Sequence, residues 1–542
     1  MALQAQAAPP ATHGMGPPAA PELISYNPAT GAELGRVPIC TAAEVTAVVA
    51  RARAAQPGWA ALPLGVRLAH LRRVRAALAE QASALADLTA AEMGKHPMEA
   101  LAGDVLFALT HLDYAITHAR RLLRPRRVRH SLLFATRYAQ VVREPRGVIG
   151  LISPYNYPIL LTANTLFMAL AAGNTVVTKP SEHTPLAVSR LAAICYQAGL
   201  PREVFQVVTG DHTTGAALIA SDIDSLIFVG GTATGQKIAT AAAARLLPVT
   251  MELGGSNAMV VLADADLEMA AQAAVWGGFV TTGQVCARVG RVLVAAPVAD
   301  QLLAAIRQAT ARAQQPAPGS TRAAIGPLTI AASLGQARLA VSEALAEGAQ
   351  LVTGGVPETY PGSGPVLCPP TVLCGVTPTM RVMREEVFGP IIAVYAVADE
   401  SEAVRIANST PYSLTASVWS RDRRRAWALA RRIRAGSVVI NDHMAPALAA
   451  ESPWGGMGGA SGYGRLGGPY GLLEVTQPKY ISYDRLPVRG YPWWYPYTPA
   501  GYRAIQALVA ALYGRTWRTR LGGLRAMLAD LQIFVGRIRW RS

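Results

Sequence analysis

The chain has 542 residues, of which 51% are apolar, 15% charged and 6% aromatic, and its formal net charge is +16. This length predicts two or three packed domains, and the apolar fraction excludes an intrinsically disordered chain. The chain has only five cysteines and no apolar run of 18 residues, which excludes a disulfide-stapled secreted scaffold, favours a cytoplasmic protein with free thiols, and predicts no membrane-spanning helix.

The N-terminal part is predicted to contain a disordered leader followed by helices. Residues 1–20 are rich in Ala, Pro and Gly, and their prolines interrupt any secretory signal, so residues 1–22 are assigned to a leader. Thr41 and Glu44 have the spacing of a helix capping box before an Ala/Val run. From about 65 to 120 the apolar spacing is helical. Leu68, Leu71 and Val74 share one face of this pattern.

From about residue 147, short β-branched runs alternate with longer Ala/Leu segments, which is typical of βαβ units in a parallel sheet. The predicted strands are Val148–Ser153, Thr175–Thr178, Val204–Val208, Leu226–Gly230 and Ala258–Leu262. The predicted helices between them are at about 158–172, 184–199 and 233–245. A second α/β region follows, with strand candidates at Val292–Ala295, Ile391–Tyr395 and Val438–Asn441. The predicted fold class is therefore α/β.

The C-terminal residues differ from the rest in composition. Residues 487–501 are rich in Pro, Trp and Tyr and are predicted to be a linker, and amphipathic helices are predicted near 501–513 and 521–538. Residues 503–542 contain eight arginines and one acid, so much of the basic excess lies here. Peripheral contact of 501–542 with an anionic membrane and packing on the protein itself or a neighbouring subunit both remain open. Nucleic acid is not favoured, because no binding motif accompanies the arginines.

Four segments contain residues suited to catalysis or binding, although each has an ordinary explanation when taken singly. The strand-glycine-helix sequence at 228–235 suits a pyrophosphate at a helix N-terminus, or is an ordinary turn. Cys286 is a candidate nucleophile or a small buried apolar residue. Glu252, before two glycines, suits the floor of a cleft or is a solvated acid. Asn156, between two prolines, is an oxyanion donor or a turn residue.

The order and spacing of the motifs are far more specific than any one of them. In chain order the motifs are SPYNYP at 153–158, KPSE at 179–182, FVGGTATG at 228–235, ELGG at 252–255, GQVC at 283–286, EEVFGP at 385–390, AGSVVIN at 435–441, PWGG at 453–456 and SGYGR at 461–465. With this arrangement, roughly residues 23–483 resemble the NAD(P)-dependent aldehyde dehydrogenase superfamily.

The resemblance implies a three-part architecture and an oligomer. It implies a Rossmann-like NAD(P)-binding domain formed by residues 23–129 and 148–254, and an α/β catalytic domain at 255–469. A small β oligomerisation arm is expected at 130–147 and 470–486, giving a homodimer or homotetramer. The segment 487–542, an aromatic linker and basic amphipathic tail, lies outside the family pattern.

The resemblance also implies the catalytic residues. Cys286 matches the family's nucleophile, which attacks the aldehyde carbonyl to give a thiohemiacetal and then a thioester. Asn156 matches the oxyanion amide, which acts with the backbone N–H of Cys286. Glu252 matches the general base that activates water to hydrolyse the thioester. Because members that acylate CoA usually lack this glutamate, its presence favours a free carboxylic acid as product.

For the cofactor, the resemblance implies NAD, with NADP as the alternative, and no metal. Lys179 and Glu182 match the pair that meets the adenosine ribose, where a carboxylate would repel a 2′-phosphate. Glu386 matches the residue that holds the nicotinamide ribose, and Phe388 the ring beside the nicotinamide. The remaining residues expected along the dinucleotide path are Ile152, Tyr155, Gly230, Gly231 and Gly235. Gly231 replaces a common serine, and Tyr155 a frequent tryptophan.

The substrate is a small-molecule aldehyde, and its predicted class follows from one loop. Residues 443–450 are largely apolar and match the family's substrate-facing loop, so we expect a medium or long apolar aldehyde. Two alternatives remain from the sequence. One is a CoA-acylating dehydrogenase, and the other is an inactive membrane-surface or scaffold protein that keeps this fold.

Overall fold

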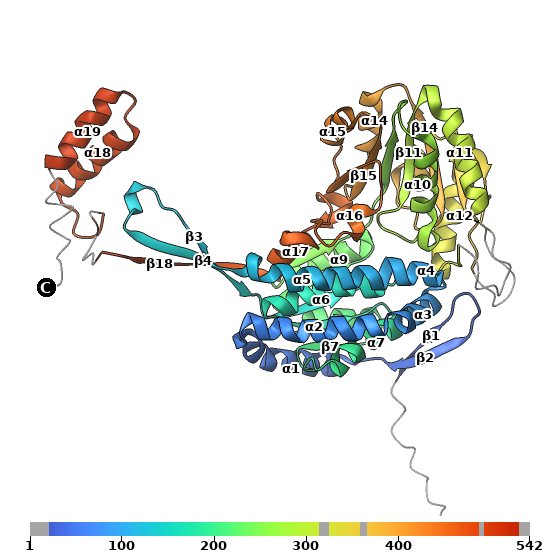
Figure 1. Ribbon diagram of the computed structural model, residues 1–542, viewed down its shortest axis with the longest axis horizontal. Coiled ribbons are helices and arrows are strands. Elements are labelled where there is room, and N and C mark those ends of the chain that lie inside the picture. The colour runs from blue at the N-terminus through green and yellow to red at the C-terminus, as the bar shows by residue number, and fades with distance from the viewer. Residues whose placement is uncertain (1–20, 314–324, 358–365, 487–490, 492, 530–542) are drawn as a thin grey trace, which may run out of the picture. The chain divides into compact units, whose positions relative to one another are not determined.

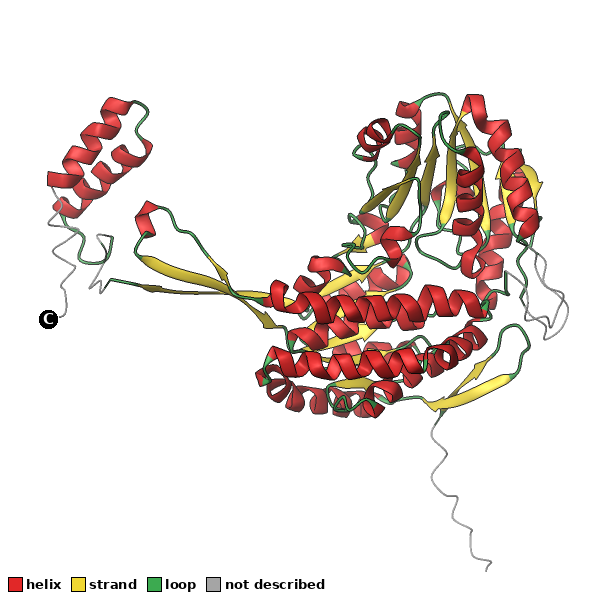
Figure 2. Ribbon diagram, in the orientation of Figure 1, coloured by secondary structure: helices red, strands yellow, loops and turns green. Residues whose placement is uncertain are grey.

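The structure is a computed structural model that describes residues 21–313, 325–357, 366–486, 491 and 493–529 (Figures 1 and 2). It divides into a large unit, Met1–Leu122 with Pro145–Gln477, and a small unit, Leu123–Glu144 with Pro478–Ser542. The predicted α/β class is confirmed, since the large unit contains two mainly parallel sheets. Most of the predicted leader lies outside the described residues, but Glu22 already begins strand β1, so the boundary predicted at residue 22 is wrong.

The first sheet of the large unit has six strands in the order β17-β9-β8-β5-β6-β7. All neighbours are parallel except β17, which pairs antiparallel with β9. The strands are apolar on both faces because helices cover both. They are β5 (Val148–Ile152), β6 (Thr175–Lys179), β7 (Phe205–Val207), β8 (Ser225–Val229), β9 (Val249–Glu252) and β17 (Gly462–Tyr463). The helices that pack on them include α1 (Ala42–Ala61), α6 (Pro158–Ala172), α7 (Pro185–Gln197), α8 (His212–Ala220) and α9 (Thr232–Ala243).

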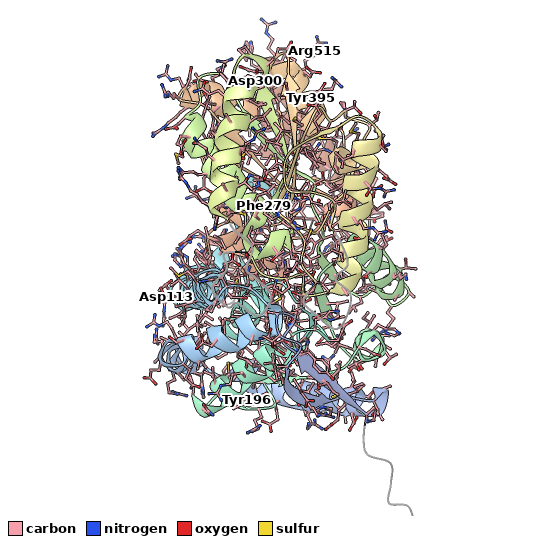
Figure 3. All side chains as sticks on the ribbon, turned by 90° about the vertical axis from the view of Figure 1, so that its right-hand side faces the viewer. Asp113, Tyr196, Phe279, Asp300, Tyr395 and Arg515 are labelled. Atoms are coloured by element: carbon pink, nitrogen blue, oxygen red, sulfur yellow. The ribbon has the colours of Figure 1, made fainter. Side chains whose placement is uncertain are left out.

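The second sheet has seven strands in the order β12-β13-β14-β11-β10-β15-β16, and only β12 is antiparallel to its neighbour. The strands are β10 (Asn257–Val261), β11 (Val289–Ala295), β12 (Gln350–Thr353), β13 (Thr371–Cys374), β14 (Ile391–Val397), β15 (Thr415–Trp419) and β16 (Ser437–Ile440). The helices around it are α10 (Leu267–Phe279), α11 (Ala299–Arg312), α12 (Ala331–Ala346), α13 (Arg381–Arg384), α14 (Glu400–Ala407) and α15 (Arg423–Ala430). Phe279 is buried in its core, whereas Asp300 is exposed (Figure 3).

The helical region predicted at 65–120 is interrupted in the structure. The capping box is confirmed, because Thr41 and Glu44 bond each other's backbone at the start of α1. The helices that follow are α2 (Leu64–Glu80), α3 (Ala82–Met93), the short α4 (Pro97–Glu99) and α5 (Phe107–Leu123). Gly94 ends α3 with a φ of 72°, which favours glycine. Between α4 and α5 a π-helix spans Ala100–Leu106, a feature common near functional sites.

Smaller elements complete the large unit. A hairpin of β1 (Glu22–Tyr26) and β2 (Glu33–Pro38) precedes the helices. The helices α16 (Ala445–Leu448) and α17 (Gly468–Glu474) follow the second sheet. The prediction assigned residues 470–486 to the arm, but residues up to Gln477 belong to the large unit.

The small unit contains a three-stranded sheet and a helical hairpin. The sheet order is β18-β4-β3, with β3 at Arg126–Arg127, β4 at Arg137–Pro145 and β18 at Thr476–Asp484. Residues 123–129, predicted to belong to the cofactor domain, are part of this unit, because β3 pairs with β4. The hairpin consists of α18 (Pro499–Tyr513) and α19 (Trp517–Ala529). Among the described residues, no helix combines the length and apolarity needed to cross a membrane.

Candidate active site

The two sheets of the large unit present opposite strand ends to one cavity of about 960 Å³. In the first sheet, Ile152, Lys179 and Glu252 are the last residues of parallel strands β5, β6 and β9, where open α/β sheets bind ligands. In the second sheet, Cys286 precedes β11 and Glu386 precedes β14. Eleven of the twelve predicted site residues line this cavity. They are Ile152, Tyr155, Asn156, Lys179, Glu182, Gly230, Gly231, Glu252, Cys286, Glu386 and Phe388.

The loop that delivers Cys286 has a strained backbone. Thr281, Thr282 and Gly283 have φ values of 52°, 57° and 67°, and a left-handed conformation is costly for β-branched residues. Polar contacts hold the loop in place. The Thr281 N–H donates to Glu99 Oε2 at 3.1 Å, and the Thr282 hydroxyl donates to the Gly326 carbonyl at 3.0 Å. The position of Cys286 therefore depends on partners distant in the sequence.

The surroundings of Cys286 favour the thiol over the thiolate. Burial, together with the nearby carboxylates of Glu386 and Glu252, raises the pKa of this thiol to about 12. Nucleophilic attack by Cys286 therefore requires that its proton be transferred to an acceptor.

Asn156 is buried in the turn between β5 and α6. Its Nδ2 donates to the carbonyl oxygen of Gln284 at 2.9 Å, which ties it to the Cys286 loop. An amide nitrogen carries two N–H groups, so the second remains available to an oxygen in the cavity. The role of Gln284 was not predicted, although its place two residues before Cys286 in GQVC was a usable signal.

Glu252 is a buried carboxylate at the end of β9, and neither of its oxygens has a hydrogen-bond partner among the described residues. Burial raises its pKa well above the ordinary value; Arg465 opposes this rise and Glu474 adds to it. Strand β17 pairs with β9 so that Gly462 lies opposite Glu252. An unpaired buried carboxylate is expensive, which is typical of a functional group.

Glu386 is the second carboxylate in the cavity, and its side chain is half-buried. Its Oε1 accepts a hydrogen bond from the Gly255 N–H at 3.0 Å, and a side chain at Gly254 would collide with its other oxygen. Burial raises the pKa of Glu386 to about 7, although the Gly255 N–H and Arg288 oppose this. The two glycines after Glu252 in ELGG therefore make room for Glu386.

The other half of the cavity suits a dinucleotide. Helix α9 begins after Gly230 and Gly231, and among the described residues no side chain caps its N-terminus, which leaves N–H groups for an anion. Lys179 Nζ and Glu182 Oε2 lie 3.6 Å apart on the same wall. The aromatic rings of Tyr155 and Phe388 pack edge to face, with their centroids 6.1 Å apart.

Gly235 differs from its prediction. It does not line the cavity, and instead lies inside the first turn of α9, where a Cβ would come within 2.6 Å of Leu253 Cδ2. The close approach of α9 to the residue after β9 explains this glycine. Its interpretation as a wall residue of the dinucleotide path is therefore wrong.

The side of the site around Cys286 is apolar. A buried cluster contains Tyr157, Leu160, Val280, Val285, Ala287, Leu414, Met444 and Trp454, with Cys286, Ala447 and Leu448 packed against it. The predicted loop 443–450 contributes Met444, Ala447 and Leu448. Trp454 was not predicted as a wall residue, although it stands in the recognised PWGG motif.

The sequence matches proteins of known type over most of its length. The sequence profile described as "Aldehyde dehydrogenase family" matches residues 18–481. A Mycolicibacterium smegmatis protein named as an NADP⁺-dependent succinate-semialdehyde dehydrogenase is 37% identical over 487 residues, covering 88% of this chain and 93% of that protein. The 4,4′-diapolycopene aldehyde oxidase of a Methylomonas species is 33% identical over 531 residues, covering 96% and 97%.

Solved structures with a similar fold are also aldehyde dehydrogenases. The crystal structure of an NAD-dependent aldehyde dehydrogenase from Sinorhizobium meliloti superposes with a TM-score of 0.82 at 32% identity, covering 88% of this chain and 93% of that one. The structural neighbours of this chain thus include an NAD-dependent enzyme, and its sequence relatives include a protein named as NADP⁺-dependent. The cavity geometry and these matches agree, and the chain belongs to the aldehyde dehydrogenase family, which uses NAD(P).

Proposed function

We propose that this protein oxidises an apolar aldehyde to the carboxylic acid with NAD(P)⁺, through a thiohemiacetal and a thioester on Cys286. One observation carries the proposal. Cys286, Glu252 and Asn156, which come from distant parts of the chain, line one cavity whose other half suits a dinucleotide.

In the first step, Cys286 Sγ bonds to the aldehyde carbon and the carbonyl oxygen becomes an anion. The free N–H of the Asn156 amide and the backbone N–H of Cys286 stabilise that oxygen. The thiol proton passes to solvent water as the carbon–sulfur bond forms, so that Glu252 is needed only in the second step. NAD(P)⁺ bound in the other half supplies the acceptor for the hydride that leaves the carbon, after which the carbon is held as a thioester.

In the second step, Glu252 takes a proton from water, which attacks the thioester and releases the acid. Burial makes this carboxylate a stronger base because it raises the pKa of Glu252 well above its ordinary value. In the alternative of a CoA-acylating dehydrogenase, CoA replaces water as the acyl acceptor. Product formation that depends on CoA would support that alternative.

For the dinucleotide, the N-terminus of α9 would hold the pyrophosphate, and Lys179 and Glu182 the adenosine ribose. Glu182 favours NAD, because its carboxylate accepts hydrogen bonds from a free 2′-hydroxyl and repels a 2′-phosphate. Lys237 and Arg245, which also line the cavity, would counter that repulsion, so the preference for NAD is expected to be modest.

The apolar substrate is supported by the apolar side chains that pack against Cys286. A short semialdehyde that carries a carboxylate needs a cation to replace its hydration. The Methylomonas relative is named for the aldehyde of a long apolar molecule, diapolycopene, and its match covers 96% of this chain. The 4% of this chain that lies outside the match is shorter than the segment 487–542, so the match extends into that segment.

We predict that kcat/KM increases with aldehyde chain length. At about 0.8 kcal/mol per buried methylene, decanal should exceed hexanal by up to about 200-fold, and succinic semialdehyde should react more slowly than hexanal. The measurement is the absorbance of reduced cofactor, with NAD and NADP compared at each substrate. Faster oxidation of succinic semialdehyde would overturn the apolar assignment, and no reduction with any aldehyde would favour an inactive scaffold.

We further propose that the tail hairpin contacts an anionic membrane surface. Gly501, Ala504 and Ala507 of α18 are buried against α19, and a Cβ on Gly523 would come within 2.7 Å of the Ala507 carbonyl oxygen. The helices are thus joined by small residues. Seven large aromatic or aliphatic side chains of the hairpin are exposed, which is unusual for a hairpin in water. They are Tyr502, Val509, Tyr513, Trp517, Leu521, Leu524 and Leu528.

Charge favours lipid as the partner of this outward face. On α19, Trp517, Leu521, Leu524 and Leu528 fall within one narrow stripe at helical spacing. Arg518, Arg520 and Arg525 flank the stripe, and residues 499–529 contain no acid. Two copies of this hairpin would repel each other, whereas anionic headgroups attract arginine.

We predict that Arg518→Gln, Arg520→Gln and Arg525→Gln together weaken binding to phosphatidylserine-containing liposomes by about 100-fold, at about 1 kcal/mol per arginine. Co-sedimentation measures the binding. The triple change of Arg421, Arg423 and Arg424 to Gln, exposed on the large unit, is the matched control and should bind normally. A chain ending at residue 486 that binds as well as the full chain would contradict the assignment.

The sheet of β18, β4 and β3 is proposed to be the arm through which copies pair as a homodimer or homotetramer. The family resemblance supports this role. The exposed aromatic residues of α18 and α19 do not belong to this sheet, so pairing through the sheet does not explain their exposure.

A further inference from the structure

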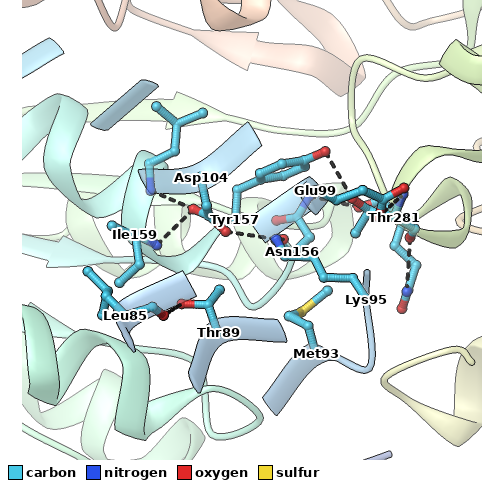
Figure 4. A network of polar contacts seen from close by, with 12 residues as sticks. Leu85, Thr89, Met93, Lys95, Glu99, Asp104, Asn156, Tyr157, Ile159 and Thr281 are labelled. Atoms are coloured by element: carbon cyan, nitrogen blue, oxygen red, sulfur yellow. Dashed lines mark hydrogen bonds and ion pairs between the residues drawn. The ribbon is translucent and has the colours of Figure 1, made fainter. Parts of the chain in front are cut away.

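A buried ion pair lies directly behind the candidate oxyanion donor (Figure 4). Lys95 Nζ and Asp104 Oδ2 are 2.7 Å apart, and their side chains are 1% and 0% exposed. Neither residue lines the cavity. Lys95 follows α3, and Asp104 belongs to the π-helix Ala100–Leu106. The pair therefore touches neither substrate nor cofactor, and its contacts indicate what it does.

The pair holds the chain on both sides of one short turn. Lys95 Nζ donates to the Asn156 carbonyl oxygen at 3.0 Å. Asp104 Oδ1 accepts from the N–H groups of Ile159 and Leu160 at 3.1 and 2.7 Å, which are donors that the first turn of α6 leaves unpaired. The Lys95 ammonium also lies 4.4 Å from the centroid of the Tyr157 ring. Lys95 thus holds the Asn156 peptide, and Asp104 holds the start of α6 three residues later.

Fold stability alone gives little reason for this arrangement. Burying two charges costs desolvation energy that their attraction only partly returns, so apolar replacements of whole ion pairs are often as stable. The contacts are also local to the turn that carries Asn156. An oxyanion donor must be held close to its working position before the reaction begins.

We propose that Lys95 and Asp104 are positioning residues that hold the Asn156 amide toward the oxygen of the aldehyde bound at Cys286. This inference rests on the proposed role of Asn156. Without Lys95, the Asn156 carbonyl loses its donor, and the peptide can rotate and carry the side chain with it. The effect then falls on stabilisation of the transition state and not on binding of the aldehyde.

The first test separates positioning from stability. Lys95→Met is expected to lower kcat about 10- to 100-fold and to change KM by less than about threefold, because Lys95 does not touch the substrate. The variant Lys95→Met/Asp104→Asn removes both charges, while the asparagine oxygen can still accept from Ile159 and Leu160. Recovery of the melting temperature with kcat still low supports positioning. Recovery of both, or a fall in kcat/KM through KM alone, overturns it.

The second test asks whether Lys95 acts through Asn156. Asn156→Ala should lower kcat about 100-fold, and Lys95→Met added to it should cost little more. A full additional loss shows independent action and overturns the inference. No effect of Asn156→Ala would instead refute the proposed oxyanion role itself. If Lys95→Met does not fold, the charge-free Lys95→Met/Asp104→Asn variant alone carries the test, and a kcat within twofold of the parent protein would then overturn the inference.

Discussion

Replacing Cys286 with alanine is expected to lower kcat by at least about 10⁴-fold, because Cys286 is the only thiol among the described residues that line the cavity. Cys286 is half-buried and packs against apolar side chains, and the change removes one sulfur atom without introducing a polar group. The fold should therefore persist. The measurement is kcat from reduced-cofactor absorbance, alongside the melting temperature and NAD binding by titration calorimetry.

Cys374→Ala is the matched control, because Cys374 ends strand β13 in the second sheet and does not line the cavity. Its activity should equal that of the parent protein. Cys286→Ser refines the result, since a hydroxyl has the same shape but is a far weaker nucleophile near neutral pH. Turnover by Cys286→Ala within tenfold of the parent would disprove covalent catalysis at this position.

The strands that could be predicted from the sequence are those buried on both faces. Strands β5, β6 and β8 are continuous apolar runs because helices cover both sides of their sheet, and their predicted bounds differ from the observed ones by one residue or none. Strand β17 could not be found in this way. It consists of Gly462 and Tyr463, which have no apolar periodicity, and it exists only because β9 offers an edge.

The candidate site shows the same division. Cys286, Glu252 and Asn156 stand in short motifs whose order identifies the family, so their shared cavity could be expected. The residues that fix them could not be predicted, because their contacts join distant segments. Lys95 contacts Asn156 across 61 positions, and Glu99 contacts Thr281 across 182. Each motif suggests which group reacts, whereas only the folded chain shows what holds that group.

Replacing Glu252 with glutamine is expected to separate the two halves of the reaction. The first turnover should still produce one reduced cofactor per active site, while the steady-state rate falls about 10²- to 10³-fold because no base activates water. Rapid-mixing absorbance shows this as a burst followed by a slow phase. If the burst slows as much as the steady state, Glu252 acts before the thioester forms, contrary to its assignment to hydrolysis.

The pH dependence gives an independent test of the same residue. Burial raises the pKa of Glu252 well above its ordinary value, so the carboxylate is protonated and inactive as a base at low pH. Steady-state kcat should therefore rise with pH, about tenfold per unit below this pKa, and level off above it. The Glu252→Gln variant should lose this rise. Glu474→Gln is the matched control: it removes a charge that raises the pKa of Glu252, so the plateau should remain while the rise moves to lower pH. A rise that persists unchanged in Glu252→Gln would assign the titration to another group.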